Sequence, residues 1–395
     1  MTDVAADIPS DSPGLTRIYL DHHATTPVDP RVVQVMARVM TEQFGNPNSA
    51  QHAYGQEAAM VVRGAAAAVA ALVDGQADDV RFTSGASEAL RMALAYACDR
   101  RRQAPLLVAA SRIEHPALIE ELLAGERDGR YRIVWMPVDA NGRVSVDTVR
   151  AALKADVDLF CLMAANNEVG TIQPFAEAAG LARQAGAEVL VDATQAAGRI
   201  PLSVAESGYD YLVLSGHKLY GPKGVGALIG PDLGEAPPPR RYAFHNSTPN
   251  VPGIAGLGEA CRLRVLEMAD DEIRISDLRD RMQVMLQDAL PGLVVNGDID
   301  ARLSNNLHIS IPGVQNDIIV ANLRDVVAIS TGAACMAGVD APSHVLQAMD
   351  IEPWRQDSAL RISLGRTTTA PEISLAAALI IQVVRQFQSP IESAA

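Results

Sequence analysis

Short apolar runs alternate with helical stretches between residues 106 and 216 of this 395-residue chain. The apolar runs are LLVAA (106–110), YRIVWMPV (131–138), DLFCLMAA (158–165), EVLVDA (188–193) and YLVLSG (211–216). Helical patterns separate them, for example at 87–101 and 174–186. Runs of this length are typical of buried strands, and their alternation with helices favours βαβ units in a largely parallel sheet covered on both faces. Because aromatic residues make up only 4% of the chain, Ala, Val, Leu and Ile must build the core.

The pattern changes in the last third of the chain. An irregular loop at 231–253 precedes a long helical stretch at about 255–290. After Pro291 come LVVNGD, NNLHISI, a short helix near 316–324, VVAIS and a final helix from about 371. We therefore expect three regions: a disordered leader at 1–16, a large domain at 17–260 and a smaller α+β domain at 261–395. We also expect the segment 17–30 to pack near the smaller domain.

Charge and cysteine content exclude several classes of protein. Lys and Arg total 33 against 47 Asp and Glu, a formal net charge of −14, so neither nucleic acid nor an anionic membrane is an expected partner. The four cysteines are far apart and form no CxxC pair, so we expect no metal site and no disulfide framework. The acidic start MTDVAADIPSDSPG does not resemble a signal peptide, and no apolar run predicts a membrane helix. We expect a cytoplasmic location.

Two strand ends carry candidate catalytic side chains. Lys218, in SGHKLYGPKGVGALIG (215–230), follows a predicted strand, where open α/β sheets bind ligands. A lysine there can lose its proton and bond to a carbonyl cofactor, although a surface lysine in a Gly-rich turn is the alternative. Asp192, at the end of another strand in VDATQ, could pair with the pyridine nitrogen of pyridoxal phosphate, or could cap the next helix.

Three further motifs could complete a coenzyme site. FTSGASEAL (82–90) leads from a strand into a helix, whose N-terminal N–H groups could bind phosphate or could only be capped. Ser215 and His217 could donate to the same phosphate. His115, in EHPA, could stack on a coenzyme ring or be a polar loop residue. NNEVGTIQP (166–174) is typical of a ligand crevice or of a helix-entry turn.

A thiol and a guanidinium are the remaining candidates. Cys335 lies in STGAACMAG, whose small residues predict a mobile loop on which a thiolate could act as a nucleophile. We expect the other cysteines, Cys98, Cys161 and Cys261, to be buried structural thiols. Arg361, in LRISLGRTTT, lies on a predicted strand and invites a carboxylate partner from either a substrate or the protein.

Taken in order, these motifs resemble the cysteine desulfurases, which belong to the aminotransferase class V group of fold-type I pyridoxal-phosphate enzymes. The resemblance runs from about Ile18 to about Ala370. It rests on YLDHHATTPVDP, FGNPNSAQHAYG, FTSGASEA, EHPA, NNEVGTIQP, VDATQ, SGHKLYGPKGVGAL, NVPGIAG, the Cys335 loop and RISLGR. It implies an α/β fold in which a large domain with a mostly parallel seven-stranded sheet is joined to a smaller α+β domain.

The resemblance also implies roles for individual residues. Lys218 would be the Schiff-base lysine, and His115 would act with it in catalysis. The coenzyme would be bound by Ala86, Ser87, His115, Asn167, Asp192, Gln195, Ser215, His217, Lys218 and, from the partner subunit of a homodimer, Thr248. Asn167 and Arg361 would bind the substrate, L-cysteine. Cys335 would take its sulfur as a persulfide, leave alanine, and pass the sulfur to an acceptor that the sequence does not name.

Two other functions share these motifs. Another class V enzyme, such as a carbon–sulfur lyase, an epimerase or a transaminase, would use Lys218 and Asp192 without needing Cys335. A degenerate, non-catalytic member is the second alternative, because the stretch RRYAFHNSTPN has His245 and Ser247 where the family usually has Arg and Gly.

Overall fold

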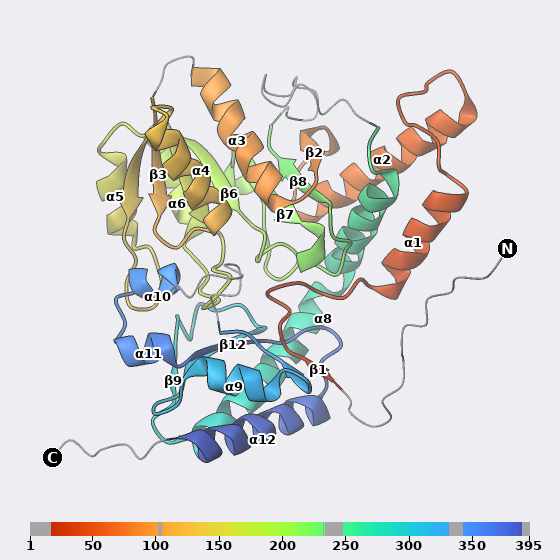
Figure 1. Cartoon of the computed structure of the whole chain (residues 1–395). Helices are drawn as coiled ribbons and strands as arrows, with labels where there is room; N and C mark the ends of the chain where they lie inside the picture. The colour runs from red at the N-terminus through yellow and green to blue at the C-terminus, as the bar shows by residue number, and fades with distance from the viewer. Residues whose placement is uncertain (1–16, 102–104, 232, 234–247, 332–342, 389–395) are drawn as a thin grey trace.

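The computed structural model describes residues 17–101, 105–231, 233, 248–331 and 343–388. The predicted leader at 1–16 and the segment that carries Cys335 lie outside these residues. Figure 1 shows a larger upper part built around a sheet, a smaller lower part, and one long helix that passes from the first into the second.

The larger part contains the predicted seven-stranded sheet, in the order β2-β8-β7-β6-β5-β3-β4. The strands are β2 (Val80–Thr83), β3 (Leu106–Ser111), β4 (Tyr131–Met136), β5 (Leu159–Met163), β6 (Glu188–Asp192), β7 (Tyr211–Ser215) and β8 (Gly226–Ile229). β8 runs antiparallel to both of its neighbours, β2 and β7, and all other pairs are parallel, so the prediction of a mostly parallel sheet is confirmed. The strand β8 itself was not predicted, because it is short and follows a glycine-rich turn.

Helices cover both faces of this sheet. Alternate residues of β7 face opposite layers: Val213 packs with α3 (Ala86–Arg101) and α4 (Pro116–Arg127), while Leu214 lies in the other core, with α2 (Ala53–Leu72) and α6 (Phe175–Gln184). Burial on both faces explains why these strands read as continuous apolar runs.

The smaller part has its own apolar core. A sheet in the order β12-β10-β9 joins β12 (Ala359–Ser363), β10 (Asn306–Ser310) and β9 (Val294–Val295). β1 (Ile18–Tyr19) pairs with β11 (Val327–Ala328), and Ile18 and Leu20 are buried in the same core. The segment at the start of the described chain therefore packs with residues more than 300 positions away.

The remaining helices are α1 (Pro30–Thr41), α5 (Val146–Leu153), α7 (Val204–Ser207), α9 (Asn316–Leu323), α10 (His344–Ala348), α11 (Pro353–Asp357) and α12 (Ala370–Phe387). By length and composition α12 is apolar enough to cross a membrane, the single such helix in the described part of the chain. Its Ile373, Ala377 and Ile380 are buried in the smaller core, as expected of an amphipathic core helix.

One helix belongs to both cores. α8 (Val251–Ala289) begins a few residues earlier than predicted, where Pro252 in its first turn and the Asn250 side chain, which accepts from Gly253 N–H, fix its start. Leu257 is buried in the larger core and Leu278 in the smaller one. The predicted division between residues 260 and 261 therefore falls inside a continuous helix, and the domain boundary stays a prediction.

The contact between α2 and α8 yields a stability prediction. A Cβ on Gly258 would lie 2.6 Å from Cα of Ala65, so Gly258→Ala should force the two helices apart and lower the free energy of unfolding by about 1–3 kcal/mol. Gly180 in α6 is the matched control, because its added Cβ meets nothing within 4 Å. Gly180→Ala should raise stability by roughly 0.5–1 kcal/mol through helix propensity. Urea unfolding measures both, and equal effects of the two substitutions would contradict the packing argument.

Candidate active site

A cavity of about 470 Å³ opens where β5, β6 and β7 end. Met163, Asp192 and Ser215 are the last residues of these strands, and all three line it. The remaining lining residues are Ala24, Thr25, Ser84, Gly85, Ala86, Ser87, Glu88, Leu90, His115, Ala165, Asn167, Thr194, Gln195, His217, Lys218, Lys223 and Gly224. The carboxyl ends of parallel strands are the expected ligand site of an open α/β sheet.

Lys218 reaches this cavity from the short helical turn Gly216–Lys218 after β7. Its Nζ donates to the backbone oxygen of His23 and, at 3.0 Å, to that of Ala24. Gln195 Nε2 donates to the same oxygen of His23 at 3.0 Å. The predicted lysine and glutamine therefore meet at one point of the N-terminal segment.

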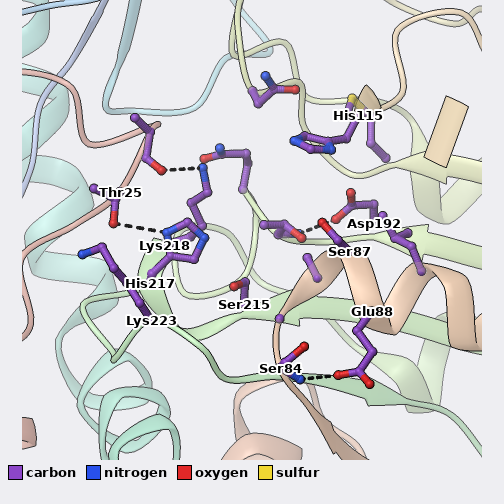
Figure 2. Close-up of a pocket in the computed structure, with 18 of the residues that line it drawn as sticks. Thr25, Ser84, Ser87, Glu88, His115, Asp192, Ser215, His217, Lys218 and Lys223 are labelled. Carbon is purple, nitrogen blue, oxygen red and sulfur yellow. Dashed lines mark hydrogen bonds between the residues drawn. The ribbon is translucent and has the colours of Figure 1, made fainter. Parts of the chain in front are cut away.

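Asp192 and His115 lie on the other side of the cavity from His217 and Thr25 (Figure 2). Asp192 is buried, and its carboxylate accepts the N–H of Thr194 at 2.9 Å. The local hydrogen bond resembles the capping role that was the alternative for Asp192. The carboxylate still lies at the cavity wall. His115 caps α4, because its Nδ1 accepts from the N–H of Ala117 at 3.1 Å. Burial lowers the pKa of His115, and the charge of Asp192 partly opposes this effect, so the imidazole is neutral at pH 7.

Backbone and side-chain donors gather at a third wall. Gly85, Ala86 and Ser87 lie at the start of α3, whose first N–H groups have no partner within the helix. His217 contacts Thr25, with 3.2 Å between Nδ1 and Oγ1, and burial lowers its pKa to about 4, helped by Lys218 and Lys223. Neutral donors and a helix N-terminus, with two lysines near them, fit a phosphate group.

Several buried polar atoms of the cavity wall have no protein partner among the described residues. They are Asn167 Oδ1, Thr194 Oγ1 and Gln195 Oε1. Such atoms are costly unless a ligand or water satisfies them. A flat ring that carries polar substituents would meet Asn167 and Gln195 at its edge, Asp192 at its nitrogen and Lys218 at its aldehyde. The cavity residues therefore fit pyridoxal phosphate.

Two predicted residues, Arg361 and Thr248, do not line the cavity. Arg361 is fully buried, and its guanidinium donates to Asp21 Oδ1 at 2.9 Å and to the backbone oxygen of Asn167 at 3.2 Å. Arg361 therefore pairs with a carboxylate of the protein, which was one of its two predicted partners. Binding of a substrate carboxylate by Arg361 stays a prediction. Thr248 is exposed, and Cys335 lies outside the described residues.

Two of the other cysteines are buried as predicted. Burial raises the pKa of Cys261 to about 12, and burial raises the pKa of Cys161 as well, so both are neutral thiols and poor nucleophiles. Cys98 is only half-buried, which corrects the prediction for that residue, because it lies near the C-terminal end of α3, at the edge of the core.

Glu114 is a residue that the sequence argument passed over, although it stands in the EHPA motif beside His115. It is fully buried, and its Oε1 accepts from Ser111 Oγ at 2.5 Å and from the N–H of Met163 at 3.0 Å. Burial raises the pKa of Glu114 to about 7.

Lys223 is a second cavity residue that was not among the predicted site residues. Its position in the GPKG turn, close to Lys218, could have indicated that it lines the cavity.

Comparisons with known proteins agree with this geometry. The family description Aminotransferase class-V matches residues 18–375. A cysteine desulfurase from Frankia sp. (strain EuIK1) is 43% identical over 399 residues, covering 95% of this chain and 93% of that protein. A solved NifS-like protein has a TM-score of 0.85 at 29% identity, over 94% of this chain and 100% of that one. A solved structure of SspA in complex with cysteine has a TM-score of 0.76 at 26% identity, over 90% and 100%.

The buried Glu114 yields a pH prediction. Its pKa is raised from 4.5 to about 7, so the folded state holds a proton that the unfolded state releases. Its contribution to stability is present below pH 4.5 and is lost as the pH rises through 7. Glu114→Gln cannot titrate and should gain stability relative to the unaltered protein between pH 5 and pH 8, by roughly 2–3 kcal/mol. Urea unfolding at both pH values checks this, with the exposed Glu126→Gln on α4 as control. Parallel curves for Glu114→Gln and the unaltered protein would refute it.

Proposed function

This chain belongs to the aminotransferase class V family, and we propose that it is a pyridoxal-phosphate-dependent cysteine desulfurase. It converts L-cysteine into L-alanine and transfers the sulfur, through a persulfide on Cys335, to an acceptor. The convergence of Lys218, Asp192 and His115 on one cavity carries the proposal. The cysteine desulfurase from Frankia, alike over nearly the whole chain, and the cysteine complex of SspA support the substrate.

The residues of the cavity divide the chemistry among them. When bound, pyridoxal phosphate supplies an electron sink for the charge left at the α-carbon of the substrate. Asp192 would keep the ring nitrogen protonated, the start of α3 and His217 would hold the phosphate, and His115 would lie against the ring. Lys218 would hold the coenzyme covalently and, as a free amine, would move the α-proton of the substrate at Nζ.

Sulfur transfer requires a thiolate, and Cys335 is assigned that role by resemblance. Its sulfur bonds to the sulfur of the substrate while the carbon–sulfur bond breaks, and the electron pair of that bond stays with the carbon, which takes a proton and becomes the methyl group of alanine. Arg361 and Asn167 lie next to each other and are assigned to the substrate carboxylate; for Arg361 this requires it to exchange one of its present partners.

Two alternatives differ in the role of the thiol. A carbon–sulfur lyase, epimerase or transaminase would keep the cavity residues and dispense with Cys335. A degenerate member would lose the coenzyme, but Lys218, Asp192 and the start of α3 all line the cavity, which favours an enzyme.

We also propose that two copies of the chain form a homodimer, as the resemblance implies. Large apolar side chains are exposed on and between α1 and α2: Val33, Met40, Phe44, Tyr54 and Met60. Thr248 is exposed and outside its own cavity, so it is free to face the partner's site. A cytoplasmic location stays a prediction.

Dimerisation is expected to bury these apolar side chains. Sedimentation equilibrium should give twice the chain mass, and Phe44→Asp should shift the equilibrium toward the single chain, because a charge at a dry interface is costly. Exposed Val284 on α8, remote from α1 in sequence, offers the control Val284→Asp. A single-chain mass for the unaltered protein would refute the dimer.

The desulfurase itself is tested by product analysis. Purified protein with pyridoxal phosphate and L-cysteine should form alanine in step with sulfide released by a reductant. Cys335→Ala should abolish sulfur transfer yet keep the visible absorption of lysine-bound coenzyme, because the cavity residues are untouched. Cys98→Ala, a change at the half-buried thiol, is the matched control. Sulfide release by Cys335→Ala would favour the lyase, and a protein that binds no coenzyme would favour the degenerate member.

A further inference from the structure

Helix α10 is attached to the two chain segments that carry His115 and Asn167. Its Val345 and Leu346 are buried in one apolar cluster with Ile113, Met163 and Val169. Ile113 stands two residues before His115, and Val169 stands two residues after Asn167. The helix therefore packs against the back of the cavity wall.

Polar contacts fix the start of the helix more specifically. Ser343 Oγ donates to Glu168 Oε2 at 2.5 Å, and the same oxygen caps the helix by accepting the N–H of Leu346 at 3.1 Å. His344 Nε2 lies 3.0 Å from the backbone oxygen of Glu114, its acceptor. Glu168 and Ser343 are both buried, at 4% and 7% exposure. Glu168 immediately follows Asn167, and Glu114 immediately precedes His115.

Burying the carboxyl group of Glu168 has a desolvation cost that a single hydrogen bond to Ser343 offsets only in part. Burial raises the pKa of Glu168, and the hydrogen bond from Ser343 opposes that shift. An apolar pair of similar size would hold the helix without desolvating a carboxyl group. What the carboxyl group adds is directionality, because the hydroxyl must point at one oxygen atom.

Ser343 lies close in sequence to Cys335, and so does Ser330 on the other side of Cys335. Cys335 lies eight positions before Ser343, and Ser330 lies five positions before Cys335. Ser330 exchanges two backbone hydrogen bonds with Arg361, of 3.1 and 2.7 Å. Both points at which the Cys335 segment joins the described fold are thus bonded to residues of the proposed site or to their direct neighbours.

We propose that the Ser343–Glu168 hydrogen bond, together with the His344 contact to Glu114, is a positioning device that fixes where the Cys335 segment joins the fold relative to the coenzyme cavity. This inference rests on the proposed function. Ser343 and Glu168 act through Cys335 and take no part in moving the α-proton. Loss of the bond therefore slows sulfur transfer and spares the chemistry that needs only Lys218.

The experiment measures these two reactions separately in the coenzyme-loaded protein. Exchange of the α-proton of L-alanine in deuterated water, followed by proton NMR, reports on Lys218 and the coenzyme. The rate of persulfide formation on Cys335 in a single turnover with L-cysteine reports on sulfur transfer. Coenzyme affinity and the visible absorption spectrum provide readouts that do not depend on activity.

Ser343→Ala should slow persulfide formation by roughly 10- to 100-fold, as small displacements of a reacting group do. The α-proton exchange rate, the spectrum and coenzyme affinity should stay within about twofold, because no cavity residue changes. Ser343→Thr keeps the hydroxyl and should restore sulfur transfer. Ser145→Ala is the matched control, since Ser145 caps α5 in the same way, accepting from Thr148, but faces no carboxylate in the described contacts.

Two results would overturn the inference. Equal losses of α-proton exchange and of persulfide formation in Ser343→Ala would mean that the hydrogen bond supports the fold as a whole. Unchanged persulfide formation would mean that the bond positions nothing. Failure of the proposed function is distinguished by measuring the unaltered protein first. If that protein forms no persulfide, the proposed function is wrong, and the inference that rests on it is wrong too.

Discussion

The backbone oxygen of His23 is the contact around which the cavity is organised. It accepts from Lys218 Nζ and from Gln195 Nε2, two side chains that come from different strand ends. The ring of His23 is buried, with its Nδ1 at 3.0 Å from the backbone oxygen of Asn167 and its Nε2 at 3.0 Å from Asn305 Oδ1. Because Gln195, Asn167 and Asn305 are buried, a displaced His23 would leave several polar groups unsatisfied at once. The conformation of Lys218 thus depends on a segment almost 200 residues before it in the sequence.

The turn that carries Lys218 is held from its other side by Tyr220. Its backbone adopts φ of +65°, a strained conformation for a tyrosine, and its N–H donates to Thr26 Oγ1 at 2.9 Å. Two guanidinium groups lie over the ring, with Arg264 at 5.8 Å and Arg366 at 5.3 Å from its centroid. Arg366 also pairs with Asp29 and Asp271. A network of charged side chains thus joins the start of α1, α8 and the chain after β12 around this strained residue, two positions after Lys218.

Strand ends and motif order made the sheet and most of the cavity predictable. Each apolar run became a strand because both faces of a parallel sheet are buried, and Asp192 and Ser215 followed from their positions at strand ends. β8 was missed since four residues after a glycine turn carry little periodicity. Glu114 and Glu168 could not be singled out, because nothing in a sequence separates a buried carboxyl group from an exposed one. The roles of His23 and Tyr220 depend on contacts between distant segments, which local patterns do not encode.

The pairing of the chain's beginning with its end has a consequence for biosynthesis. The Arg361 guanidinium donates to Asp21, the His23 N–H donates to Ser363 Oγ, and β1 lies beside β11. During translation the first strand emerges early and lacks its partners until β11 and β12 have left the ribosome. The long central sheet can form in the meantime from contacts between consecutive βαβ units. Binding of the coenzyme by a growing chain is therefore delayed until the carboxyl-terminal strands arrive, so an incompletely synthesised polypeptide lacks a finished site.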